Sequence, residues 1–126
     1  MIWVFTCTLV HMNAINSTPI HVQLTEEQGI ELAEIFRLMG DPTRLRIILL
    51  CVNGPICVSD IAESLGVEQS LVSNHLRLLR AGRVLKARRQ GKQMFYSVAD
   101  EHISCVVADM VEHVVEPVDE HDESLL

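Results

Sequence analysis

Apolar residues recur with a helical period over most of the chain, and capping and turn residues divide this pattern into segments. The predicted helices cover residues 25–40, 41–52, 58–65, 69–80 and 100–116. Thr25 and Asp41 are suitable N-caps, and Pro42 fits the first position of its helix. Between the fourth and last helices, residues 84–89 and 93–98 read as two strands around a tight turn, Gln90-Gly91-Lys92. The pattern predicts a mainly α-helical domain with one small β-hairpin.

The helical period also predicts which side chains form the core. The expected buried positions are Ile30, Ala33, Ile35, Phe36 and Met39 in the first helix, Leu45, Ile48, Leu49 and Val52 in the second, Val72, Leu76 and Leu79 in the fourth, and Ile103, Val107, Met110, Val111 and Val114 in the last. Cys51 lies on the apolar side of the second helix and is also expected in the core.

The third and fourth predicted helices have the spacing of a helix-turn-helix. Ala62 is a small residue where two helices would cross, Gly66 makes the turn, and Val72 anchors the second helix. A basic hairpin directly after such a unit is typical of a winged helix. We therefore expect a winged helix-turn-helix that binds double-stranded DNA. The alternative without function is a solvent-exposed basic hairpin that binds no ligand.

Net charge alone argues against DNA binding, because the chain carries −7. The distribution changes this picture: seven of the ten basic residues lie within 77–92, whereas residues 100–126 hold nine acids and no Lys or Arg. The predicted DNA-binding side chains can contact base edges or phosphates. They are Gln69, Ser70, Ser73, Asn74, His75 and Arg77 on the second helix of the unit, and Arg88, Arg89 and Lys92 on the wing.

The last predicted helix carries a row of metal-binding side chains. At about 100° per residue, His102, Val106, Asp109, His113 and Glu116 share one face, and the aliphatic residues lie on the other side. His102 and His113 are eleven residues apart, about 16 Å along the axis, so one ion cannot contact both. The alternative interpretation is a solvent-exposed helical face whose histidines bind no metal.

A second copy of the helix running antiparallel removes the distance problem. In a two-fold dimer, Asp100 and His102 of one chain would face His113 and Glu116 of the other, giving two equivalent sites. Two imidazoles and two carboxylates form a plausible tetrahedral set for zinc or cobalt. We therefore expect a homodimer through the first and last helices.

Other features of the sequence bound the cellular context. The four cysteines have no disulfide-framework spacing, and the apolar stretch 1–12 lacks a basic region, a cleavage site and the length to span a bilayer. These features predict a cytoplasmic protein without a membrane segment. Residues 1–23 are expected to form a flexible arm, 24–116 the folded domain and 117–126 a disordered acidic tail; Met12 is an alternative start.

Taken together, these motifs resemble the ArsR/SmtB family of metal-responsive repressors. The similarity rests on segments 39–50, 57–66, 70–84 and 88–98, and on the closing D-x-H-x10-H-x2-E of Asp100, His102, His113 and Glu116. The resemblance implies a dimer that binds operator DNA without metal and releases it when zinc or cobalt binds between the last helices. A metal efflux or sequestration gene would then be derepressed.

The resemblance also implies a second metal site. Related zinc repressors carry C-x3-H in the arm and C-x2-D at the third helix, and Cys7, His11, Cys57 and Asp60 fit these spacings. Cys57 lacks a neighbouring cysteine, however, and the alternative interpretation is a small core residue. Sensing of nickel, or of a thiol-reactive or oxidative signal through cysteine, remains the alternative within this class. A metal-dependent hydrolase is disfavoured because four protein ligands would close the site, and a metal buffer would not need the winged helix.

Overall fold

The computed structural model describes residues 23–118, which form five helices and a three-stranded antiparallel sheet. The elements are α2 (Glu26–Met39), α3 (Pro42–Val52), β1 (Ile56–Cys57), α4 (Val58–Leu65), α5 (Gln69–Ala81), β2 (Leu85–Gln90), β3 (Gln93–Val98) and α6 (Glu101–Val115). The winged helix-turn-helix predicted from the sequence is confirmed. The arm before residue 23 and the tail after residue 118 lie outside the described residues.

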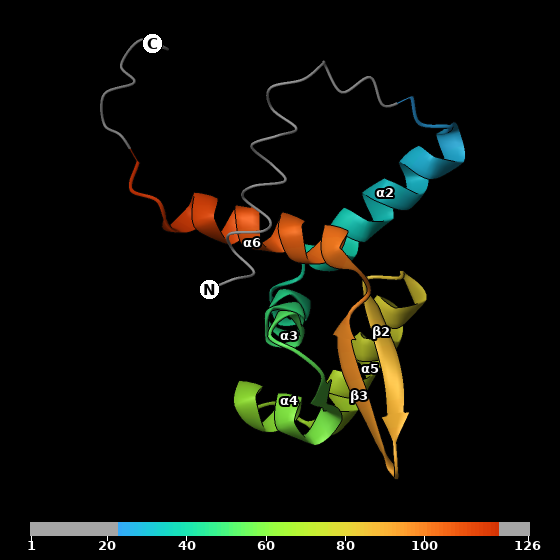
Figure 1. Cartoon of the computed structure of the whole chain (residues 1–126), viewed down its shortest axis with the longest axis vertical. Helices are drawn as coiled ribbons and strands as arrows, with labels where there is room; N and C mark the ends of the chain where they lie inside the picture. Colours follow the sequence, from blue (N-terminus) through green and yellow to red (C-terminus); the bar gives the residue numbers. More distant parts are fainter. Residues whose placement is uncertain (1–22, 119–126) are drawn as a thin grey trace.

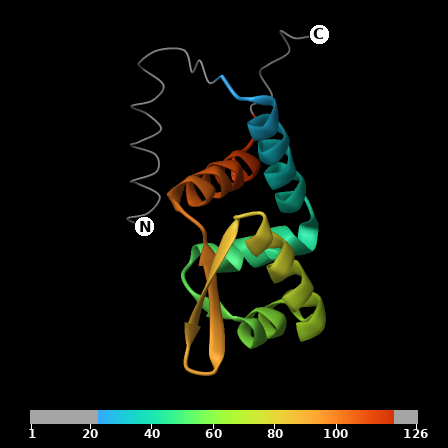
Figure 2. The same cartoon turned by 90° about the vertical axis from the view of Figure 1, so that its right-hand side faces the viewer.

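The elements divide into two parts, shown in Figures 1 and 2. Helices α3, α4 and α5 and the hairpin form a head, while α2 and α6 lie together across one end of it. The turn between β2 and β3 lies at the opposite end of the head from α6. The tip of the candidate DNA-binding wing and the candidate metal helix are therefore at opposite ends of the described structure, although the base of the wing leads directly into α6.

Side-chain caps fix the helix starts where the sequence predicts them. Thr25 and Gln28 form a capping box, in which the Gln28 N–H donates to Thr25 Oγ1 at 3.2 Å and the Thr25 N–H donates to Gln28 Oε1 at 3.0 Å. The Asp41 carboxylate accepts from the Arg44 N–H at 2.9 Å. This N–H, with the Arg44 guanidinium, holds the pKa of Asp41 below its ordinary value.

The core lies between α3, α4, α5 and the sheet. Its fully buried side chains are Ile47, Ile48, Cys51, Ile61, Val72, Leu76, Leu79, Val84 and Leu85. The expectations for α5 and for Cys51 are confirmed. Burial raises the pKa of the Cys51 thiol to about 12, so this group stays protonated at neutral pH.

Two expectations about α3 are wrong. Leu45 and Leu49 are 38% and 36% exposed, and Ile47 is completely buried instead. The helix has apolar residues on two faces, and the face against α4 and α5 forms the core. Leu45 turns toward α2 and α6, where it lines an apolar groove. The period alone could not distinguish these two faces.

The expected burial of α6 and α2 also needs correction. Only Val107 is buried on α6 among the predicted core residues, since Met110 is 54% exposed and Val114 is 77% exposed. On α2, Ile30 and Phe36 are likewise 66% and 55% exposed. Both helices extend beyond the head, so one chain does not supply enough surface to cover their apolar faces.

The sequence pattern also missed β1, which contains only two residues. Ile56 pairs with Tyr96 and Cys57 pairs with Phe95, so β1 forms the edge of the sheet beside β3. Strand β2 pairs with β3 from Leu85 opposite Val98 to Gln90 opposite Gln93. The observed strands differ from the predicted ones by one residue at the start and end of β2.

Candidate functional site

Helix α5 presents polar side chains on the side that does not pack against the core. Val72, Leu76 and Leu79 are completely buried and fix the rotation of the helix. The opposite side exposes five of the residues predicted to contact DNA: Gln69, Ser70, Ser73, Asn74 and Arg77. Gly66, with φ of 66°, makes the turn from α4, because this left-handed conformation favours glycine.

His75 differs from the other residues in this predicted set. Its side chain is half-buried, and Nδ1 is buried without a hydrogen-bond partner within the described residues. The imidazole therefore lies at the border between the core and the exposed face of α5. Asp41 is among the groups that interact electrostatically with it.

The wing places its cationic side chains around the hairpin turn. Arg88, Arg89 and Lys92 are all exposed. Gly91 has φ of 62° at the first of two central turn positions, a conformation that glycine adopts readily in two-residue hairpins. The Arg89 Nε donates to the Gly91 carbonyl oxygen at 3.2 Å, which holds this guanidinium close to the turn.

The end of α5 is tied to α2. Arg83 follows the helix with φ of 58° and forms an ion pair with Glu31 of α2. Gly82 packs against Leu38, which is only 3% exposed. These contacts connect α5, which carries the candidate DNA-binding side chains, to α2, one of the two helices that lie across the end of the head.

Helix α6 begins at the position expected from the sequence. One Asp100 carboxylate oxygen, Oδ1, accepts from the Ile103 N–H at 3.1 Å, and Glu116 is the C-cap. Asp100, His102, His113 and Glu116 are exposed. Within residues 23–118, no three His, Cys, Asp or Glu side chains gather closely enough to hold an ion. One chain thus separates the two halves of the predicted metal site, as the distance along the helix requires.

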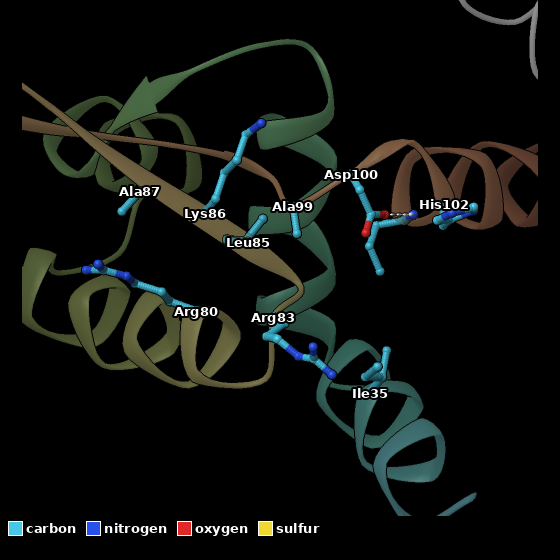
Figure 3. A pocket seen from close by; sticks show the side chains of 10 residues that line it. Ile35, Arg80, Arg83, Leu85, Lys86, Ala87, Ala99, Asp100 and His102 are labelled. Atoms are coloured by element: carbon cyan, nitrogen blue, oxygen red, sulfur yellow. Dashed lines mark hydrogen bonds between the residues drawn. The ribbon is translucent and has the colours of Figure 1, made fainter. Parts of the chain in front are cut away.

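A hollow of about 610 Å³ adjoins one half of this predicted site (Figure 3). It lies between α5, β2 and the start of α6, and Asp100 and His102 are among its lining residues. Its other charged lining residues are Arg80, Arg83 and Lys86. The sequence did not predict this neighbourhood, although the run of basic residues between 77 and 92 contains all three.

An apolar groove borders the ligand row of α6. It has a volume of about 380 Å³ and is lined almost entirely by aliphatic and aromatic side chains. Its lining includes Phe36 and Met39 from α2, Leu45 from α3, and Val106, Met110, Val111 and Val114 from α6. Contiguous exposed apolar surface of this kind is typical of a protein interface.

The second predicted metal site is only partly within the described residues. Cys57 is 5% exposed, and its Sγ lies 3.2 Å from Ser59 Oγ. Asp60 is exposed on the first turn of α4. Cys7 and His11 lie outside the described residues, so this site stays a prediction.

Comparisons with known proteins identify relatives of the chain. The family model for the bacterial regulatory protein, arsR family, matches residues 41–86. A transcriptional repressor SmtB homolog from Synechocystis sp. is 34% identical over 108 residues, which cover 86% of this chain and 81% of that protein. A cadmium resistance transcriptional regulatory protein CadC homolog from Staphylococcus aureus is 32% identical, with 79% and 82% covered.

A solved structure shows the same fold. The homodimeric winged helix-turn-helix DNA-binding domain from Mycobacterium bovis superposes with a TM-score of 0.68 at 24% identity. The match covers 82% of this chain and 98% of that domain.

Among the helices in residues 23–118, none has the length and apolar character that a membrane span requires.

Proposed function

Because the chain belongs to the ArsR family of transcriptional regulators, which bind DNA and are not enzymes, we propose that it is a metal-sensing repressor. It acts in the cytoplasm as a homodimer. The metal-free dimer binds operator DNA, and zinc or cobalt between the two α6 helices releases it. A gene for metal efflux or sequestration is then derepressed.

The arrangement of α6 carries this proposal. His102 and His113 lie on one exposed row about 16 Å apart, beside apolar residues that the chain itself leaves uncovered. A partner helix packed antiparallel on this apolar surface brings His113 and Glu116 of one chain to Asp100 and His102 of the other. The interface and the metal site thus use adjacent parts of the same helix. The homodimeric relative from Mycobacterium bovis supports this assembly.

The residues present fit a zinc or cobalt ion. Two imidazole nitrogens and two carboxylates per site are ligands that these ions accept in tetrahedral geometry. Asp100 uses Oδ1 to cap α6, and its other oxygen is not used by the cap. When bound, the ion supplies a fixed cross-link between the two α6 helices at each end of their contact.

Such a cross-link can control DNA binding through the short connection between α6 and the wing. Only Ala99 and Asp100 separate β3 from α6, so the angle between paired α6 helices sets the direction of both heads. Two heads must reach major-groove half-sites about 34 Å apart. An ion that favours a different angle between the α6 helices than DNA binding requires lowers DNA affinity. The loss equals the difference between the ion's binding free energies in the two arrangements, about 1–3 kcal/mol.

The test separates sensing from DNA binding. The operator is first selected from a random DNA pool with the metal-free protein, and affinity is then measured with and without Zn²⁺, Co²⁺ and Ni²⁺. His102→Ala and His113→Ala should retain metal-free binding and lose metal-induced release. Glu112→Gln, which removes an exposed acid of α6 outside the ligand row, should behave like the wild type.

The same assay distinguishes the other sensing sites. Cys57→Ser should keep the zinc response, because the buried thiol is outside the α6 site. Loss of the response in Cys57→Ser, with retention in His113→Ala, would instead assign sensing to the cysteine. A stronger release by Ni²⁺ than by Zn²⁺ would favour the nickel alternative.

A further inference from the structure

The outer face of the wing and the first turn of α6 border a second cavity, which is separate from the apolar groove. It measures about 600 Å³ and is lined by the end of α3, both hairpin strands and the start of α6. In the strand register, Lys86 lies opposite Ser97 and Arg88 lies opposite Phe95, so these four side chains share one face of the sheet. The volume lies within the range of small-molecule sites in proteins.

One wall of this cavity contains a polar group that the fold leaves unsatisfied. Ser104 of α6 is only 4% exposed, and its Oγ is buried without a hydrogen-bond partner within the described residues. A buried hydroxyl without a partner destabilises the folded state, so such a group requires an explanation. Because Ser104 is also a lining residue, rotation of its side chain would let a hydrogen-bonding ligand in the cavity supply the missing partner.

The charges around the cavity restrict what this ligand can be. Lys86 and Arg88 on β2 form no ion pair with any described residue, although both line the cavity. Asp100 and Glu101 lie at the α6 end, where Asp100 caps the helix. An anionic group is therefore attracted to the β2 side and repelled from the α6 side. A ligand with negative groups at both ends is disfavoured.

The rest of the lining is suited to an apolar body. Val52 and Pro55 at the end of α3 and Phe95 and Val98 of β3 are among the lining residues. Phe95 is half-buried and offers an aromatic ring beside Arg88. We propose that this cavity binds a small organic monoanion, with its carboxylate facing Lys86 and Arg88 and its apolar body against Phe95.

Occupation of this site would affect DNA binding without metal. Arg88 belongs to the wing and is one of the residues expected to contact DNA phosphate. A carboxylate paired with the Arg88 guanidinium competes with a phosphate for the same N–H donors. The monoanion therefore weakens DNA binding at a site that shares only Asp100 with the proposed metal site.

The experiment is a titration of the metal-free full-length protein, followed by backbone amide shifts in heteronuclear NMR spectra. The probe is phenylacetate. Benzylamine, which carries a positive charge, and succinate, which carries two negative charges, are the controls. Phenylacetate should give saturable shifts at Lys86, Ser97 and Ser104 with a Kd below about 1 mM, and the two controls should not. Because no metal is present, the result is independent of zinc sensing.

Two variants test the assignment of the residues. Lys86→Gln should weaken phenylacetate binding about tenfold, whereas Lys92→Gln, the same charge change at the hairpin turn, should leave it unchanged. Ser104→Ala should fold at least as stably as the wild type and bind the probe more weakly. The proposal is overturned if phenylacetate gives no saturable shifts, if benzylamine binds equally well, or if Lys86→Gln binds like the wild type.

Discussion

Substitution of Gly82 tests the connection between α5 and α2. A Cβ built at Gly82 overlaps the Leu38 Cδ1 and lies 3.5 Å from the Leu78 carbonyl oxygen. Leu38 is 3% exposed and cannot move into solvent without losing its packing. Gly82→Ala should therefore destabilise the fold by about 1–3 kcal/mol, the usual cost of an added methyl group in a packed core.

A double-mutant cycle assigns this cost to Leu38. Leu38→Ala alone should cost about 2–5 kcal/mol because it leaves a cavity. The double variant should cost less than the sum of the single variants by about 1 kcal/mol or more, since the new methyl group fills part of that cavity. Gly29→Ala is the matched control: no atom lies within 4 Å of its added Cβ, and α2 should gain about 0.5–1 kcal/mol.

The measurement is urea unfolding followed by circular dichroism, at one protein concentration for all variants because dimer stability depends on concentration. The same samples are then tested for DNA affinity. Gly82→Ala should reduce both stability and DNA affinity, because the added methyl group disturbs the end of the reading helix. If the loss of stability in the double variant equalled the sum of the losses in the two single variants, the contact between position 82 and Leu38 would not be the cause of the destabilisation.

Three further outcomes follow from the structure. Arg89→Ala should weaken binding to all DNA sequences and reduce the salt dependence of binding. Arg77→Ala should instead cost about 1–3 kcal/mol of discrimination between operator and other sequences. If Arg77→Ala weakened binding to all sequences equally, its predicted contact with a base edge would be wrong. Met110→Glu should give a folded monomer in sedimentation experiments, because this side chain is 54% exposed within one chain; an unchanged dimer would exclude this face as the interface. The pKa of Asp41 is lowered by the Arg44 N–H, so its stabilising contribution is present above about pH 4 and is lost as pH falls through the lower folded-state pKa; Asp41→Asn should reduce this acid sensitivity in pH-dependent unfolding.

The sequence predicted those parts of the fold that depend on local signals. Thr25 and Asp41 cap their helices as expected, because each side chain accepts a hydrogen bond from an N–H three residues later. Gly66 and Gly91 occupy the turns that require positive φ. In each case the cause and its effect lie within a few residues.

The failures concern interactions between distant segments. β1 has two residues and exists because Ile56 pairs with Tyr96, forty positions later, which no local period can reveal. The expected burial of Met110 and Val114 overlooked the limited surface of one chain. The sequence analysis assigned no role to Ser104, since only the packed structure shows that its hydroxyl is buried. The candidate metal ligands on α6 could be selected by residue type, but the proposed site requires a second chain to bring them together.

The two-residue strand β1 has a mechanical consequence. It joins α4 directly, and its pairing with Tyr96 and Phe95 connects the middle of β3 to the start of the helix-turn-helix. This pairing restrains the wing relative to the helix-turn-helix, so we expect the head to move largely as one body. If a metal binds at α6 as proposed, we therefore expect it to change the spacing and tilt of each head as a whole, and not to withdraw the wing alone.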